Sequence, residues 1–143
     1  MMAQVKTKMS SQTEQVAEAF LFPQGIAGFP DAKRFAFIYE GRGNMVCMQS
    51  IDLPEAAFIL TPWDEERLGK PPTLGQEQRH CLELNSDEEM VWMVVLNPFA
   101  DPDWVTANLK APVALSYTSR RGVQLIRPES EHDLRFHWIP QPK

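Results

Sequence analysis

The stretch TANLKAPV, residues Thr106–Val113, separates two apolar segments and decides how the rest of the chain is interpreted. It places a polar Asn-Leu-Lys step where a strand would bury one face, and it ends on a proline that begins another apolar run. Because the interior of a strand gains nothing from Asn or Lys, we interpret this step as a tight irregular turn. The Asn108 amide can donate and accept hydrogen bonds in such a turn, and Pro112 is tolerated as the first residue of a strand.

Short strand-like segments surround this stretch. Between Arg34 and Glu40, aromatic residues alternate with Ala36 and Ile38, which predicts a half-buried strand. Residues 90–96 are apolar on both faces, which predicts a central strand covered on both sides. Further strands are predicted at residues 19–22, 45–49, 56–61, 79–84, 113–117, 123–127 and 134–138. Nine short strands, with helical candidates only at 64–69 and near the N-terminus, predict an all-β, mostly antiparallel sandwich or barrel.

Length and composition indicate one domain. A chain of 143 residues has the size of a single domain with one core. Twelve prolines against seven glycines favour many short elements over long helices. We divide the chain into a polar, flexible N-terminal tail at 1–18, a β domain at 19–139 and a short C-terminal tail at 140–143.

The net charge and the number of cysteines indicate which classes of partner and which cellular compartment to expect. The net charge of −5 disfavours direct binding of nucleic acid, whereas an acidic surface can steer a basic protein partner. Two cysteines, Cys47 and Cys81, are too few for a disulfide framework, which points to a reducing cytoplasm. The sequence contains no apolar run of the ~20 residues that a membrane helix requires, so we expect no membrane association.

No catalytic or metal-binding set assembles from the sequence. The three histidines, His80, His132 and His137, have no metal-ligand spacing. Cys81 follows His80 directly, and on the predicted strand their side chains would point apart, which disfavours a nucleophile and base pair. The glycines form no phosphate-binding loop and no nucleophile elbow. We therefore expect no enzymatic activity, no metal and no cofactor.

Two kinds of surface residue are candidates for protein contacts instead. Trp63 and Trp104 sit beside predicted loops, where a half-exposed aromatic side chain can anchor a partner. The acidic cluster at residues 87–89 precedes the buried strand and offers charge to a basic partner.

Three further segments are considered together with residues 106–113. They are GIAGF at residues 25–29, MQSIDLP at residues 48–54 followed by Phe58, and GVQLI at residues 122–126. Together these four segments resemble the GIPGF, LQSxDxPxxxF, TxNLxAP and GxQVI motifs of the FliW flagellar assembly factors, in the same order. The chain departs from the family pattern at Ala27, where proline is usual, and at Ala107, where a β-branched residue is common.

The resemblance implies a single β-rich pseudo-barrel and a non-enzymatic cytoplasmic regulator. In the family, the protein binds flagellin, and once flagellin is exported it binds the translational regulator CsrA and blocks repression of flagellin synthesis. CsrA is a basic RNA-binding protein, which suits an acidic antagonist. The motifs and loops predict six residues that contact protein partners: Gln49, Ser50, Asp52, Asn108, Lys110 and Trp104. The alternative is a small β-barrel that binds a small molecule or a flavin in an apolar pocket.

Overall fold

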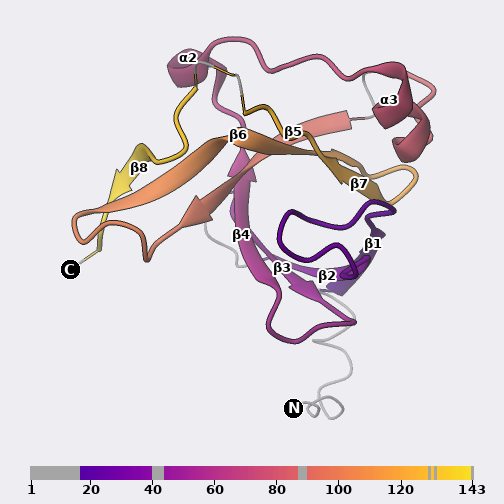
Figure 1. The fold of residues 1–143 in the computed structure, drawn as a ribbon, viewed down its shortest axis with the longest axis horizontal. Coiled ribbons are helices and arrows are strands. Elements are labelled where there is room, and N and C mark those ends of the chain that lie inside the picture. The colour runs from indigo at the N-terminus through magenta and orange to yellow at the C-terminus, as the bar shows by residue number, and fades with distance from the viewer. Residues whose placement is uncertain (1–16, 40–43, 87–89, 129, 131, 143) are drawn as a thin grey trace.

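The computed structural model describes residues 17–39, 44–86, 90–128, 130 and 132–142 (Figure 1). Its elements in chain order are β1 (Ala17–Leu21), β2 (Arg34–Tyr39), β3 (Val46–Ser50), β4 (Ala57–Pro62), α2 (Glu65–Leu68), α3 (Gln76–Leu82), β5 (Met90–Asn97), β6 (Trp104–Ser116), β7 (Arg121–Gln124) and β8 (Phe136–Pro140). No helix within these ranges is long and apolar enough to cross a membrane.

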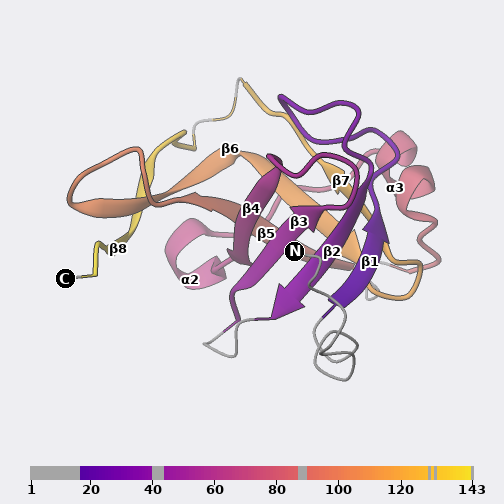
Figure 2. The same ribbon diagram turned by 90° about the horizontal axis from the view of Figure 1, so that it is seen from below.

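The strands form a closed barrel with one strand added outside it. The sheet runs in the order β5-β4-β3-β2-β1-β7-β6-β8, and an additional pairing of β5 with β6 closes it. All pairings are antiparallel except the single parallel bridge between Leu21 of β1 and Arg121 of β7. In Figure 2 the strands β4, β3, β2 and β1 lie side by side, and β8 lies outside the barrel against β6. The predicted all-β barrel is therefore confirmed, with eight strands in the described residues.

The barrel interior is filled by side chains. Phe20 and Phe37 stack with ring centroids 4.3 Å apart, and Phe22 packs edge-on against Phe35 at 5.2 Å. All four rings are buried, as is Met48 of β3. This cluster is the main hydrophobic core, and its close packing is the largest source of stability.

Strand β5 has a core on each side, as its two-sided apolar pattern predicts. Met93 belongs to the barrel interior, whereas Val94 packs outside it with Leu109 and Trp138. Trp92 joins a third cluster with Leu82 of α3. The two outer clusters explain why α2, α3 and β8 cover this side of the barrel.

Residues 79–84 are not a strand, contrary to the sequence prediction. Residues 79–82 form the last part of α3 (Gln76–Leu82), which begins after Gly75 and is capped by Glu83 in the left-handed conformation, with φ 56°; Leu84 lies beyond the helix. Two contacts at the end of the helix fix it: the Ser119 hydroxyl donates to the Leu82 carbonyl at 2.7 Å, and Arg121 donates to the Cys81 carbonyl at 3.5 Å. This six-residue window contains too few apolar residues to distinguish the 3.6-residue periodicity of a helix from the two-residue alternation of a strand.

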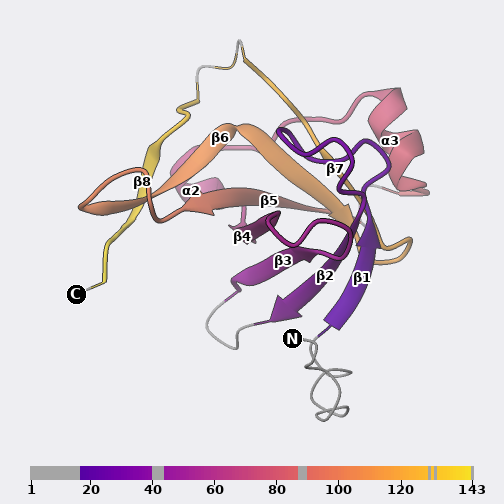
Figure 3. The ribbon, with the colours of Figure 1, turned by 60° about the horizontal axis from the view of Figure 1, so that its bottom comes forward.

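The Asn-Leu-Lys step is not a turn either. Strand β6 is continuous through it and merges the predicted strand at 113–117 with the preceding residues. The irregularity lies in the pairing with β5, where Val95 pairs with Asn108 but Met93 pairs with Val113. Four residues of β6 thus oppose Val94 alone, and the strand bends at this bulge, as β-bulges do (Figure 3).

Other sequence predictions have mixed outcomes. The turn after the first strand and the helix near residues 64–69 are confirmed. The helical candidate near the N-terminus spans residues 14–20, and its described part, residues 17–20, belongs to β1. The predicted tail at 1–18 falls largely outside the described residues, and the acidic cluster at 87–89 lies wholly outside them. The division into tails and domain stays a prediction.

Candidate functional site

The four motif segments come together at one end of the barrel. Figures 2 and 3 show the loop between β1 and β2 beside the loop between β3 and β4. The first loop is a tight turn in which Ile26 and Phe29 exchange backbone hydrogen bonds of 3.3 and 2.7 Å. Gly25 has φ 72°, and a Cβ there would lie 2.5 Å from the Pro30 carbonyl oxygen, so the turn requires glycine.

Gln124 of β7 joins three of these segments through one side-chain amide. Its Oε1 accepts a hydrogen bond from the Ala27 backbone N–H at 2.8 Å. Its Nε2 donates to the Ala111 carbonyl at 3.1 Å. In the same strand, Gly122 lets the Phe22 ring pack against the backbone, because a Cβ there would lie 2.3 Å from that ring. The amide therefore fixes the turn at residues 25–29 against both β6 and β7.

The fourth segment, residues 48–54, is a loop that holds itself together. The Ser50 hydroxyl accepts from the backbone N–H groups of Asp52 and Leu53, at 3.1 and 2.8 Å. The Gln49 Nε2 atom lies within hydrogen-bond distance of the carbonyls of Ser50, Pro54 and Ala56, at 3.1, 3.1 and 3.4 Å. The polar residues of this motif thus satisfy backbone groups that the sharp turn leaves unpaired.

Asp52 links this loop to the start of β2. Its carboxylate pairs with the Arg34 guanidinium at 3.0 Å and accepts from the backbone N–H groups of Arg34 and Lys33, at 3.1 and 3.4 Å. The hydrogen bond from the Arg34 side chain, together with the Arg34 backbone N–H, lowers the pKa of the Asp52 carboxyl. The rings of Phe29 and Phe58, with centroids 5.9 Å apart, pack the first turn against β4, which follows this loop.

The predicted contact residues Asn108 and Lys110 brace the connection that follows β7. Asn108 Oδ1 accepts from the Lys110 backbone N–H at 3.0 Å. The Lys110 ammonium donates to the carbonyls of Pro128 and Ser130, at 3.2 and 2.6 Å. Both side chains are half-buried, and these contacts tie β6 to the chain that crosses over it.

Trp104, the remaining predicted contact residue, lies at the other end of β6. Its ring stacks on His137 with centroids 4.7 Å apart and an angle of 9° between the planes. Five of the six predicted residues belong to the motif segments by sequence, whereas Trp104 lies where β6 begins and pairs with Pro140 of β8. The other tryptophan singled out from the sequence, Trp63, donates its indole N–H to the Gly69 carbonyl at 2.8 Å.

The six predicted contact residues do not include the apolar side chains that this end exposes. Ile51 and Ile126 are 50% and 54% exposed, although each belongs to a motif. Ile126 borders a hollow of about 310 Å³ that the turn at residues 24–30 also lines. Ile51 donates its backbone N–H to the Arg34 carbonyl at 2.8 Å, where the turn enters β2. We call the exposed set Ala27, Gly28, Ile51 and Ile126 the motif-end surface.

The remaining chemistry of the described residues is sparse. They contain no group of three or more His, Cys, Asp or Glu residues that could hold a metal ion. Burial raises the pKa of the Cys81 thiol, which makes it a weak nucleophile. A surface depression of about 530 Å³ beside Trp63 and Trp92 is lined by none of the motif residues.

Comparison with known proteins identifies the family. A family model described as FliW protein matches residues 4–138. The flagellar assembly factor FliW of Syntrophus aciditrophicus is 27% identical over 124 residues, which are 84% of this chain and 77% of that protein. Flagellar assembly factor FliW 2 of Desulfotalea psychrophila is 29% identical over 85% of this chain and 81% of its own. A crystal structure of the flagellar assembly factor FliW shares the fold, with TM-score 0.72 and 24% identity over 83% of this chain and 84% of that one. This chain belongs to the FliW family.

Proposed function

We propose that this chain is a non-catalytic flagellar assembly factor of the cytoplasm that binds flagellin and, when released, binds CsrA and relieves its repression of flagellin synthesis. The family match over residues 4–138 and the relatives named flagellar assembly factors support the general assignment. The binding of flagellin and CsrA follows the family resemblance of the motif segments.

One structural observation carries the binding proposal. Motif segments that are up to about a hundred residues apart meet at one end of the barrel, because Gln124 connects Ala27 with Ala111. Their polar side chains are used to brace backbone, whereas the apolar Ile51 and Ile126 remain exposed. A rigid scaffold that presents exposed apolar residues with a polar rim suits a protein–protein contact.

The motif-end surface also accounts for alternating partners. If flagellin and CsrA both bind there, each excludes the other, and loss of flagellin frees the surface for CsrA. The acidic net charge of −5 favours association with basic CsrA. Binding then switches with flagellin supply without a change in the fold of this protein.

The packed barrel disfavours the alternative of a flavin or small-molecule carrier. The described interior is occupied by fully buried Phe22, Phe35, Phe37 and Met48, so a ligand there would have to displace core side chains. The hollows of about 530 and 310 Å³ are partly open to solvent, whereas a ligand pocket encloses most of a bound molecule.

Isothermal titration with both purified partners tests the proposed function. We expect heat from flagellin and from CsrA separately, and no further heat from CsrA once flagellin saturates the protein. Absence of a complex with either partner would refute the proposal. Simultaneous binding of both would refute the shared surface alone.

A further inference from the structure

The hollow beside Ile126 is the part of the motif-end surface that has room for a group from a partner. Its volume is about 310 Å³, and it is lined by residues 24–28 and Pro30 of the turn, by Gln124 of β7 and by Ile126. This volume lies at the lower end of the range of ligand pockets, which is roughly 300–1,000 Å³. The hollow therefore suits one side chain of a partner better than a molecule of cofactor size.

The lining of this hollow is uncharged. None of the described residues that line it carries a charged side chain. Its Gln124 amide is already paired, because Oε1 accepts from the Ala27 backbone N–H at 2.8 Å and Nε2 donates to the Ala111 carbonyl at 3.1 Å. A charged group that entered would lose part of its hydration and gain no ionic partner, which costs free energy. The hollow therefore favours an uncharged, apolar group.

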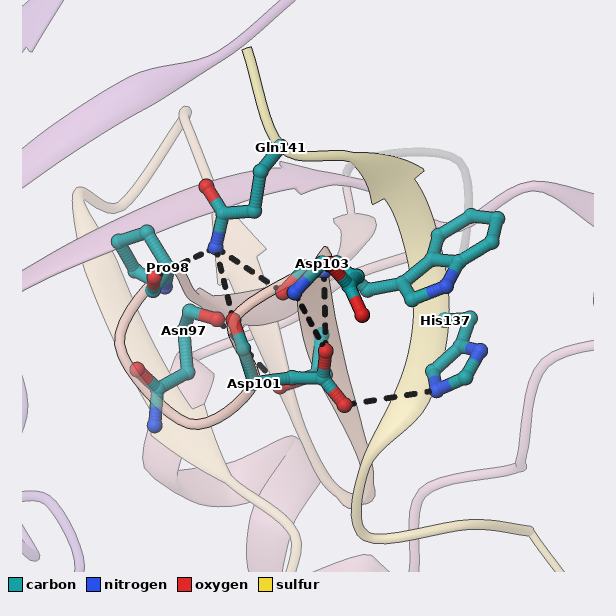
Figure 4. Close-up of polar contacts among 8 residues, drawn as sticks. Asn97, Pro98, Asp101, Asp103, His137 and Gln141 are labelled. Carbon is teal, nitrogen blue, oxygen red and sulfur yellow. Dashed lines mark hydrogen bonds and ion pairs between the residues drawn. The ribbon is translucent and has the colours of Figure 1, made fainter. Parts of the chain in front are cut away.

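An uncharged lining is not a general property of hollows on this surface. Beneath the connection between β5 and β6, far from the turn (Figure 1), a hollow of about 550 Å³ has Asp101 in its lining. The Asp101 carboxylate accepts from the N–H groups of Asp103 and Trp104, at 2.7 and 3.1 Å. Its second oxygen lies 3.9 Å from His137 Nε2 (Figure 4). That hollow contains a carboxylate, whereas the hollow beside Ile126 contains no charged group among its described residues.

The turn that forms one side of the hollow is held in place by its own contacts. Ile26 and Phe29 exchange backbone hydrogen bonds across it, and Gln124 binds it to β7. Gly28 has φ 87°, and a Cβ there would meet no atom within 4 Å, so open space lies beside this residue. A turn that is already ordered loses little conformational entropy when a partner binds.

We infer that the hollow beside Ile126 receives one uncharged apolar side chain, aliphatic or aromatic, of the protein partner that the motif-end surface binds. This inference rests on the proposed function and deepens it by naming the chemical class of the group that fills the hollow. The contact at this point depends on the burial of apolar surface and not on an ion pair.

Titration calorimetry of purified flagellin with variants of Ala27 tests the inference. Ala27 is exposed and lines the hollow, so Ala27→Lys, Ala27→Glu and Ala27→Gln add a positive, a negative and an uncharged side chain beside it. All three keep the backbone N–H that donates to Gln124, and their melting temperatures should stay near that of wild type. We expect both charged variants to weaken flagellin binding at least about tenfold, because each places a charge against an apolar group. Ala27→Gln should weaken it less than either.

The same three substitutions at Ala100 are the matched control. Ala100 lies in the connection between β5 and β6, outside the motif-end surface, and its variants should bind flagellin with an affinity near that of wild type. A loss of affinity as large as that at Ala27 would show that the effect is not local to the hollow beside Ile126, which would overturn the inference.

The remaining outcomes separate this inference from the proposed function. If the wild type binds flagellin and all three Ala27 variants bind it equally well, the inference is wrong and the proposed function stands. Opposite effects of Ala27→Lys and Ala27→Glu would show that the group in the hollow is charged. An equal loss in all three variants would show that only size matters, and either result overturns the inference. A wild type that binds no flagellin would overturn both.

Discussion

At the residue scale, the motif side chains act mainly on backbone groups. Within the fold, the polar residues predicted to contact partners form hydrogen bonds with backbone carbonyl and N–H groups, as Lys110 does with the carbonyls of Pro128 and Ser130. They stand out in the sequence because polar residues are unusual between apolar ones. Their hydrogen bonds to backbone groups within the fold account for their presence. Their spatial partners are not readable from the sequence, because each lies many positions away.

Gln124 should contribute more to stability than an ordinary surface glutamine. Gln124→Ala removes the amide that pairs with Ala27 and Ala111, and we expect a loss of about 1–3 kcal/mol in urea unfolding. Gln24→Ala, at an exposed position on the same turn, is the control and should change stability by less than about 0.5 kcal/mol. Equal effects of the two substitutions would show that the amide does not hold the motif segments together.

Asp52 should make stability depend on acidity. Its folded-state pKa is lowered below the ordinary value of 3.8 by Arg34, so its contribution is fully present above that value and is lost as pH falls through the folded pKa. The stability difference between wild type and Asp52→Asn should therefore be constant near neutrality and shrink in acid. Chemical denaturation at a series of pH values measures it, and a difference that grows on acidification would contradict the assigned contacts.

At the element scale, helices and strands can be predicted where the apolar residues follow one clear periodicity. They cannot be predicted where a segment is short or its strand pairing is irregular. β2 follows its alternation, with Phe35 and Phe37 buried, and β5 follows its two-sided pattern. Residues 79–84 resemble a strand in sequence because Leu82 and Leu84 lie at strand spacing. The continuity of β6 is not evident from the sequence, because Asn108 pairs with Val95 beside a bulge opposite Val94 that accommodates Lys110.

The helical form of α3 has a direct mutational signature. Leu82 is fully buried and packs against Trp92 and Val123, so Leu82→Ala should cost about 2–5 kcal/mol of unfolding free energy. His80 lies on the exposed side of the helix, and His80→Ala should change stability by less than about 0.5 kcal/mol. Thermal or urea unfolding measures both variants. Similar losses of unfolding free energy would show that this segment is not a helix with Leu82 on its buried side.

At the scale of the whole molecule, the closure of the barrel cannot be predicted from local sequence patterns. The β5–β6 pairing and the single β1–β7 bridge join strands whose contact depends on the complete barrel, and they bring the motifs to one end. The overall charge, in contrast, is read directly from composition. The closed barrel and the net charge together describe an acidic scaffold with an apolar motif-end surface.

Charge should govern how fast the protein meets CsrA. Because the chain carries a net charge of −5, association with a basic partner is steered by long-range attraction. Salt shortens the screening length, which is ~10 Å at 0.1 M, so the association rate should fall as salt rises. Stopped-flow mixing at several salt concentrations measures this rate, and a rate independent of salt would exclude steering.

The central claim is that the motif-end surface binds the protein's partners, and calorimetric titration of flagellin into Ile126→Ser tests it most directly. Ile126 is 54% exposed, so the substitution should leave the melting temperature near that of wild type. Leu134→Ser, at a residue 55% exposed outside this surface, is the matched control. We predict that Ile126→Ser weakens flagellin binding at least about tenfold while Leu134→Ser binds normally. Wild-type affinity in a normally folded Ile126→Ser protein would contradict the claim.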